Sequence, residues 1–165
     1  LYLNDGSNNF TEQTISNDPI NDASNARSPA SVFAADVDGD GDVDVLSASL
    51  WGNKIALYLN DGSNNFTEQT ISNNARGALS VFAADVDGDG DVDVLSASRN
   101  DDKIALYLND GSNNFTEQTI STNAEIAISV FAVDADDDGD VDVLSASSKD
   151  DKIALYLNDG SNNFT

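Results

Sequence analysis

Apolar and polar residues alternate along most of this 165-residue chain in short runs, separated by clusters of Asp, Asn, Gly and Ser. One representative stretch has four such runs, at residues 80–84, 92–98, 103–108 and 115–120. In the third run the larger apolar side chains, Ile104, Leu106 and Leu108, occupy every second position. That period is typical of β-strands, and the intervening residues favour tight turns. No segment shows the 3.6-residue period of a helix.

The same stretch recurs at a step of 49 residues. Val32, Val81 and Val130 open one repeated phrase, and Leu57, Leu106 and Leu155 open the phrase LYLNDGSNNF. Four short antiparallel strands per repeat, at a period of this length, match a propeller blade. The sequence therefore predicts an all-β protein, a β-propeller built of four-stranded antiparallel blades, with about three blades per chain. A β-solenoid and disordered low-complexity sequence are the alternatives; solenoid coils are usually shorter, and each repeat carries enough apolar residues for a sheet.

We expect one repeat domain over residues 1–165 that is cut out of phase with its blades. Its predicted parts are the third and fourth strands of a blade plus an inserted loop, two blades, and a partial blade, at residues 1–30, 31–79, 80–128 and 129–165. The insertion is seven residues long and falls between Ser16 and Asn25. Because the chain starts within a motif and lacks methionine, we interpret it as a processed form or an excised piece.

Each repeat contains a run of alternating aspartates, here called an Asp ladder, at residues 36–44, 85–93 and 134–142. Five acids stand at positions 1, 3, 5, 7 and 9 of each ladder, between two predicted strands. Hard cations such as calcium take six to eight oxygen ligands. We expect carboxylates of positions 1, 3, 5 and 9, with the backbone carbonyl of position 7, to hold one ion per ladder. The predicted metal-site residues are Asp36, Asp38, Asp40, Asp42, Asp44, Asp85, Asp87, Asp89, Asp91, Asp93, Asp134, Asp136, Asp138, Asp140 and Asp142.

The ladder predicts Ca²⁺, three ions per chain. Magnesium demands near-ideal octahedral geometry, and the absence of His and Cys argues against zinc and copper. Gly90 at position 6 allows a sharp turn, and Asp137 replaces the glycine at position 4 of the third ladder. The site is not a helical EF-hand, because position 12 is serine (Ser47, Ser96 and Ser145) and strand-forming residues follow.

The net charge of −23 limits the kinds of partner that the protein could bind. Nucleic acid and anionic membrane surfaces would be repelled, and we expect no membrane insertion because no apolar run is long enough to span a bilayer. Without cysteine, the compartment cannot be deduced from disulfides. Self-repulsion destabilises the compact state unless cations neutralise part of the charge.

The phrases SVFAADVDGDGDVDVLSAS, DDKIALYLNDG and FTEQTIS closely resemble the FG-GAP/VCBS repeats of bacterial secreted and cell-surface proteins. Similar repeats build the calcium-carrying β-propeller of integrin α-subunits and some fungal lectins. The resemblance covers essentially the whole chain. It implies blades with a calcium loop between the first two strands, an extracellular or cell-surface location, and roles in adhesion or ligand display. Propellers of the family are most often seven-bladed, more than this chain holds.

No catalytic constellation is evident, so we do not expect an enzyme: Glu12, Glu68, Glu117 and Glu125 look isolated and solvent-facing. The predicted function is a calcium-binding structural, adhesion or ligand-display scaffold. The alternative is a calcium-dependent carbohydrate-binding propeller, with Trp51 stacking on a sugar; a protein ligand is also open. Because three repeats do not easily form a ring, we expect two chains to close a six-bladed one.

Overall fold

The computed structural model describes residues 1–16 and 28–165. The predicted insertion between Ser16 and Asn25 lies outside the described residues. The first two strands form a hairpin, β1 (Tyr2–Asn4) and β2 (Phe10–Glu12). A four-stranded sheet follows, made of β3 (Pro29–Ala35), β4 (Asp44–Ser49), β5 (Lys54–Asn60) and β6 (Phe66–Ser72).

The second four-stranded sheet consists of β7 (Ala78–Ala84), β8 (Asp93–Ser98), β9 (Lys103–Asn109) and β10 (Phe115–Ser121). A three-stranded sheet contains β11 (Ala127–Val133), β12 (Asp142–Ser147) and β13 (Lys152–Tyr156). In the larger sheets each strand pairs antiparallel with the next strand of the chain. The described residues contain no helix and no closed barrel. The predicted fold class, propeller blades of four antiparallel strands, is confirmed. Among the same residues there is no helix that could cross a membrane.

The first strand of each blade is longer than the sequence suggested. β7 begins at Ala78, two residues before the predicted start, because Ala78 pairs with Ser98 beyond a shift in register between Ala78 and Ser80. The same shift occurs at the start of β3 and of β11. A β-bulge of this kind bends the strand and increases its twist. Apolar alternation cannot reveal it, because the bulge places two residues opposite one partner.

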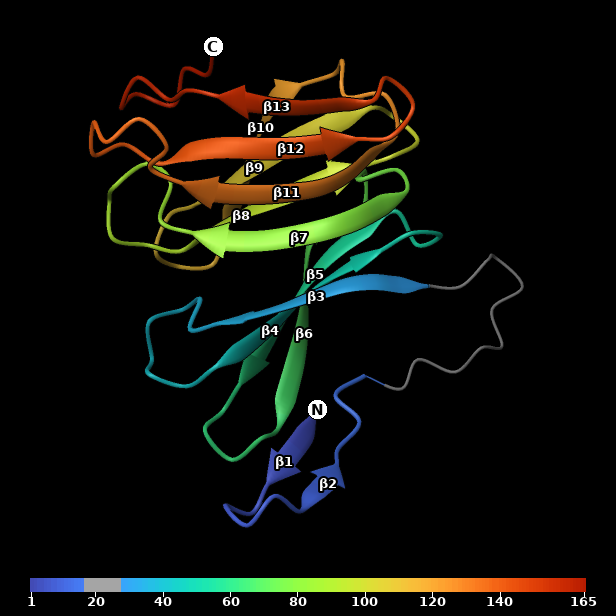
Figure 1. Ribbon diagram of the computed structural model, residues 1–165. Helices are drawn as coiled ribbons and strands as arrows, with labels where there is room; N and C mark the ends of the chain where they lie inside the picture. Colours follow the sequence, from blue (N-terminus) through green and yellow to red (C-terminus); the bar gives the residue numbers. More distant parts are fainter. Residues whose placement is uncertain (17–27) are drawn as a thin grey trace.

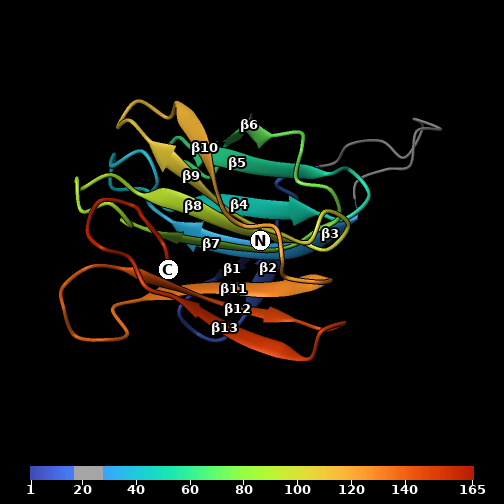
Figure 2. The ribbon, with the colours of Figure 1, turned by 90° about the horizontal axis from the view of Figure 1, so that it is seen from above.

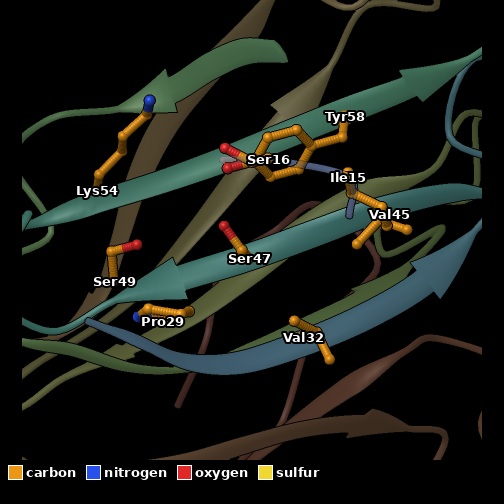
Figure 3. Close-up of a pocket in the computed structure, with 9 residues that line it drawn as sticks. All are labelled: Ile15, Ser16, Pro29, Val32, Val45, Ser47, Ser49, Lys54 and Tyr58. Carbon is orange, nitrogen blue, oxygen red and sulfur yellow. The ribbon is translucent and has the colours of Figure 1, made fainter. Parts of the chain in front are cut away.

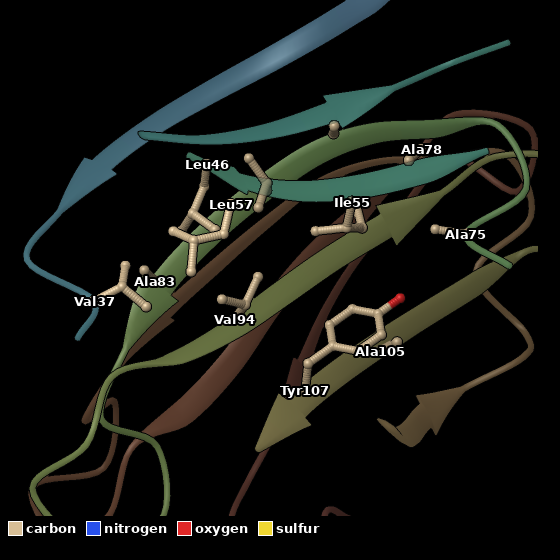
Figure 4. Close-up of a cluster of buried hydrophobic side chains, with 12 residues drawn as sticks. Val37, Leu46, Ile55, Leu57, Ala75, Ala78, Ala83, Val94, Ala105 and Tyr107 are labelled. Atoms are coloured by element: carbon tan, nitrogen blue, oxygen red, sulfur yellow. The ribbon is translucent and has the colours of Figure 1, made fainter. Parts of the chain in front are cut away.

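The blades pack face to face, with β3, β7 and β11 side by side (Figures 1 and 2). Alternate residues of each strand point to opposite faces of the sheet. In the middle blade, a neighbouring blade covers each of the two faces. Between the first and second blades lie Leu46, Ile55 and Leu57 from one side and Val94 and Tyr107 from the other (Figure 4). All five side chains are 0–1% exposed.

A second cluster repeats this packing between the second and third blades, with Leu95, Ile104 and Leu106 against Val130 and Val143. An aromatic row crosses both interfaces. The ring centroids of Phe33 and Phe82 lie 4.7 Å apart, and those of Phe82 and Phe131 lie 4.6 Å apart. Tilted contacts at this distance add to the stabilisation that comes from burial. The repeat thus encodes one interface, which the chain forms twice.

Candidate metal centre

The three Asp ladders form the loops that join β3 to β4, β7 to β8 and β11 to β12. Their backbone turns sharply because residues at positions 4 and 6 adopt positive φ. In the second ladder these are Gly88 at 74° and Gly90 at 96°. Asp137 takes the position of Gly88 in the third ladder, with φ of 63°. The left-handed conformation is permitted to glycine and, with more strain, to Asp. The loop is therefore the same in all three blades despite the substitution.

Carboxylates converge in every ladder. Oxygen atoms of three acids lie within 4.8 Å of one another in each, a spacing that one cation could bridge. The three groups are Asp36, Asp38 and Asp40; Asp85, Asp87 and Asp93; and Asp134, Asp136 and Asp142. Positions 1 and 3 are common to all three groups. The third carboxylate of the group comes from position 9 in two ladders and from position 5 in one.

The carboxylate at position 1 accepts a hydrogen bond from the loop backbone and also belongs to the group of converging carboxylates. In the first ladder, Oδ2 of Asp36 accepts a hydrogen bond from the Gly41 N–H at 3.0 Å, and the Asp134 carboxylate accepts the equivalent bond from Gly139. The other oxygen, Oδ1, is buried in both residues and has no hydrogen-bond partner within the described structure. A buried carboxylate oxygen without a partner is costly unless a cation satisfies it. The residues present therefore fit a bound metal ion.

The carboxylate at position 9 is fully buried and holds the loop in place. In the second ladder, Asp93 accepts hydrogen bonds from the N–H of Val86 to Oδ2, at 2.9 Å, and from the N–H of Asn109 to Oδ1, at 2.8 Å. Burial raises the pKa of Asp93 to about 6, outweighing the two backbone N–H groups, which lower it. Asp44 and Asp142 accept the same pair of bonds.

At position 3 the carboxylates face like charges. Burial is the main cause that raises the pKa of Asp38, followed among the raising causes by the negative charges of Asp44, Asp40 and Asp36. The pKa of Asp87 is raised for the same first reason. Carboxylates crowded in this way favour protonation until a divalent cation neutralises them. The electrostatics of the loop thus favour cation binding.

Position 7 behaves differently from the other ladder positions. The carboxylate of Asp91 lies over Gly111 in the turn between β9 and β10, where a Cβ added to Gly111 would come within 2.5 Å of Oδ2. Asp42 lies over Gly62 and Asp140 over Gly160 in the same manner. The side chain at this position therefore packs on the neighbouring turn, and none of the three belongs to the converging carboxylate groups. The sequence had assigned this position a role only through its backbone carbonyl.

We predict that Gly111→Ala destabilises the protein by about 1–3 kcal/mol, because Ala must adopt φ near 72° and its Cβ meets the Asp91 carboxylate. The measurement is urea unfolding. In the double variant Asp91→Ala/Gly111→Ala the steric part of the loss should disappear, leaving the strain of positive φ. Equal losses for Gly111→Ala in the presence and absence of Asp91 would show that the close approach has no energetic weight.

An asparagine that sequence reasoning treated only as a turn residue links adjacent ladders. The Nδ2 group of Asn109 donates to the carbonyl of Val92, at 3.2 Å, and across the blade interface to that of Val37, at 3.4 Å. Its Oδ1 accepts from the N–H of Asn113. Asn158 repeats the two donor contacts, to the carbonyls of Val141 and Val86, whereas its Oδ1 has no hydrogen-bond partner among the described residues. The signal that could have identified them is their recurrence at the same step of 49 residues as the ladders.

The isolated glutamates of the sequence have specific partners. Glu68 forms an ion pair with Lys54, and Glu117 with Lys103, in each case across the third and fourth strands of a blade. Glu125 pairs with Lys149. Glu68 and Glu117 are exposed and Glu125 is partly exposed, as the sequence predicted, but each also forms an ion pair that the sequence did not reveal. Trp51 lies in the turn between β4 and β5 and is 59% exposed.

Comparison with known protein families gives two overlapping matches. A family model described as FG-GAP-like repeat matches residues 36–96 and again residues 85–145. Each match starts at the first aspartate of one ladder and ends after the next ladder and part of the strand behind it. No curated protein matches the chain.

Proposed function

Because the chain belongs to the FG-GAP-like repeat family, we propose that it is a calcium-binding β-propeller module that carries three Ca²⁺ ions, one per Asp ladder. The observation that carries the proposal is the convergence of three carboxylates in every ladder together with the partnerless buried oxygens of Asp36 and Asp134. Positions 1, 3, 5 and 9 supply the carboxylates. A bound ion would supply the positive charge that the loop otherwise lacks.

The donor set supports calcium over other metals. All candidate ligands are oxygen atoms, and the sequence has neither His nor Cys, the usual ligands of zinc and copper. Calcium accepts irregular oxygen cages, whereas magnesium keeps several waters and an octahedral geometry. We expect dissociation constants of about 10⁻⁶ to 10⁻³ M, between those of intracellular sensors and extracellular modules.

The ions serve structure rather than chemistry in this proposal. Each ladder joins the first two strands of its blade, and its buried position-9 carboxylate is bonded to the turn between the third and fourth strands. An ion held there would fasten both loops of the blade at one end. FG-GAP repeats are typically extracellular structural and adhesion repeats, so the module acts as a secreted or cell-surface scaffold for adhesion or ligand display, and not as an enzyme.

Removal of calcium tests the proposal. At free calcium 100 times the dissociation constant, each site stabilises the fold by about 2.7 kcal/mol. Since 1 kcal/mol shifts the Tm of a chain of this size by about 2–4 °C, excess EDTA should lower the Tm by about 15 °C or more. Magnesium at the same concentration is the control and should restore little of the loss. A Tm that EDTA leaves unchanged would contradict the proposal.

A carbohydrate-binding function is the second candidate, supported by the exposure of Trp51, the only tryptophan. A flat aromatic ring in an accessible turn can stack on a sugar face. This function predicts binding on a glycan panel in calcium that is lost in Trp51→Ala while the Tm stays unchanged. Absence of binding to any glycan would leave the scaffold as the remaining function.

A further inference from the structure

The middle blade shows what each face of a blade needs. The face that includes Val81, Val94 and Tyr107, here called the leading face, packs against the preceding blade. The face that includes Ile104 and Leu106, here called the trailing face, packs against the following blade. All five side chains are at most 4% exposed. Equivalent residues in the outer blades should be equally buried wherever a neighbouring blade is present.

The first blade has an incompletely covered leading face. Val32 is 69% exposed, whereas its equivalents Val81 and Val130 are each 4% exposed. A cavity of about 250 Å³ lies over this face (Figure 3). Seven of its nine lining residues come from β3, β4 and β5, at positions that in the middle blade belong to the leading face; they are Pro29, Val32, Val45, Ser47, Ser49, Lys54 and Tyr58.

The third blade has an uncovered trailing face. Ile153 is 83% exposed and Leu155 is 44% exposed. Their equivalents in the first and second blades are fully buried; these are Ile55, Ile104, Leu57 and Leu106. Exposed apolar faces of this kind mark interaction sites, and burying such side chains is strongly favourable.

The two uncovered faces correspond to the two sides of the interface that neighbouring blades form within the chain. Ile153 and Leu155 are the same residue types, in the same strand register, as Ile55 and Leu57, which pack against a leading face between the first two blades. We infer that the trailing face of one copy of this chain docks on the leading face of a second copy, head to tail. Two copies joined at both ends close a ring of six blades, within the four to eight of known propellers. A head-to-tail contact whose rotation closes gives a ring and not a filament.

The N-terminal hairpin occupies part of the position in which the docked blade of a second copy would lie. Gln13 Nε2 donates to the carbonyl of Asn64 at 2.5 Å. The same bond joins Gln69 to the carbonyl of Asn113, at 2.5 Å, in the following blade. The hairpin β1–β2 therefore lies over the leading face as the third and fourth strands of a preceding blade would. The cavity occupies the place of that blade's first two strands, which β11 and β12 of the second copy fill.

One strand must be displaced when the copies dock, because β1 of one copy and β13 of the second copy would occupy the same third-strand position. β13 is the longer of the two, five residues against three. The ring therefore keeps β13 in place. For β2 to pair beside it as the fourth strand, Phe10 and Thr11 must also replace Phe164 and Thr165, which pair with Asn158 and Leu157 in the isolated chain. Glu12 could then form an ion pair with Lys152 of the second copy, as Glu68 does with Lys54 and Glu117 with Lys103.

The experiment uses light scattering of the 165-residue chain at about 10 μM in calcium, and again in EDTA with added salt. The faces contain no ladder carboxylate, so failure of calcium binding and failure of docking are separable. The wild type should have twice the 17.4 kDa chain mass, about 35 kDa. Val32→Asp and Ile153→Asp alter exposed side chains on opposite faces, and each alone should remain at the mass of one chain. Trp51→Asp, an exposed apolar residue outside both faces, is the matched control and should leave the dimer intact.

Mixing the two single-face variants is the decisive part of the experiment. Ile153→Asp retains an intact leading face and Val32→Asp an intact trailing face, so the mixture should recover a dimer through one interface, while neither variant pairs with itself. The inference is overturned if the wild type has the mass of one chain, if the mass grows continuously with concentration, or if both variants alone remain dimeric. It is also overturned if the mixture stays monomeric although both variants show wild-type circular dichroism and melting.

Discussion

Replacing Asp93 by alanine is expected to destabilise the protein by about 3–5 kcal/mol. The Asp93 carboxylate is 0% exposed and accepts the backbone N–H groups of Val86 and Asn109. Its removal leaves both donors unsatisfied in the interior and detaches the ladder from the neighbouring turn. Urea unfolding in EDTA measures this structural role separately from any loss of metal.

Two further substitutions make the result specific. Asp93→Asn retains one acceptor oxygen and leaves one of the two N–H donors unpaired, so it should cost less than Asp93→Ala. Asp89→Ala changes an exposed carboxylate that accepts one bond, from the N–H of Asp91, and should cost less than about 1 kcal/mol in EDTA. If Asp93→Ala and Asp89→Ala have equal effects in EDTA, position 9 has no special structural role.

The second large effect is expected for Leu106→Ala, at about 2–5 kcal/mol, since Leu106 is 0% exposed between the second and third blades. The repeat supplies a matched control, because Leu155 occupies the same strand position in the third blade and is 44% exposed. Leu155→Ala should cost less than about 1 kcal/mol at protein concentrations where light scattering reports a single chain.

The difference between these leucines should depend on self-association. When two copies dock, Leu155 becomes buried, and the cost of Leu155→Ala should rise toward that of Leu106→Ala as protein concentration increases. Equal costs for the two substitutions in the isolated chain would contradict the assignment of Leu106 to an interface between blades.

The architecture could be predicted from the sequence because every blade repeats a strong local pattern. Alternation of Ile104, Leu106 and Leu108 predicted a strand, and these side chains do lie on one face, toward the third blade. Asp137, which the sequence placed at a glycine position of the ladder, adopts the positive φ of that glycine. Such features depend on neighbours within a few residues, which a sequence displays directly.

Other features depend on contacts between distant segments, which local patterns do not show. The ladder pattern indicated that Asp93 binds a metal, but its bond to Asn109 joins residues 16 apart in sequence. The bond from Asn109 to Val37 joins residues 72 apart, in different blades. The contact of Asp91 with Gly111 was equally hidden. These contacts determine how the candidate site is held, whereas the sequence indicated only its candidate ligands.

The most direct test of the central claim is a calorimetric titration of the chain with calcium, which counts the ions bound. The account predicts three ions per chain for the wild type and two for Asp87→Ala, which removes one of the converging carboxylates of the second ladder. Asp38→Ala and Asp136→Ala, at the same position in the other ladders, should each also give two. A wild-type chain that binds no calcium at millimolar concentration, or an Asp87→Ala variant that still binds three ions, would contradict it.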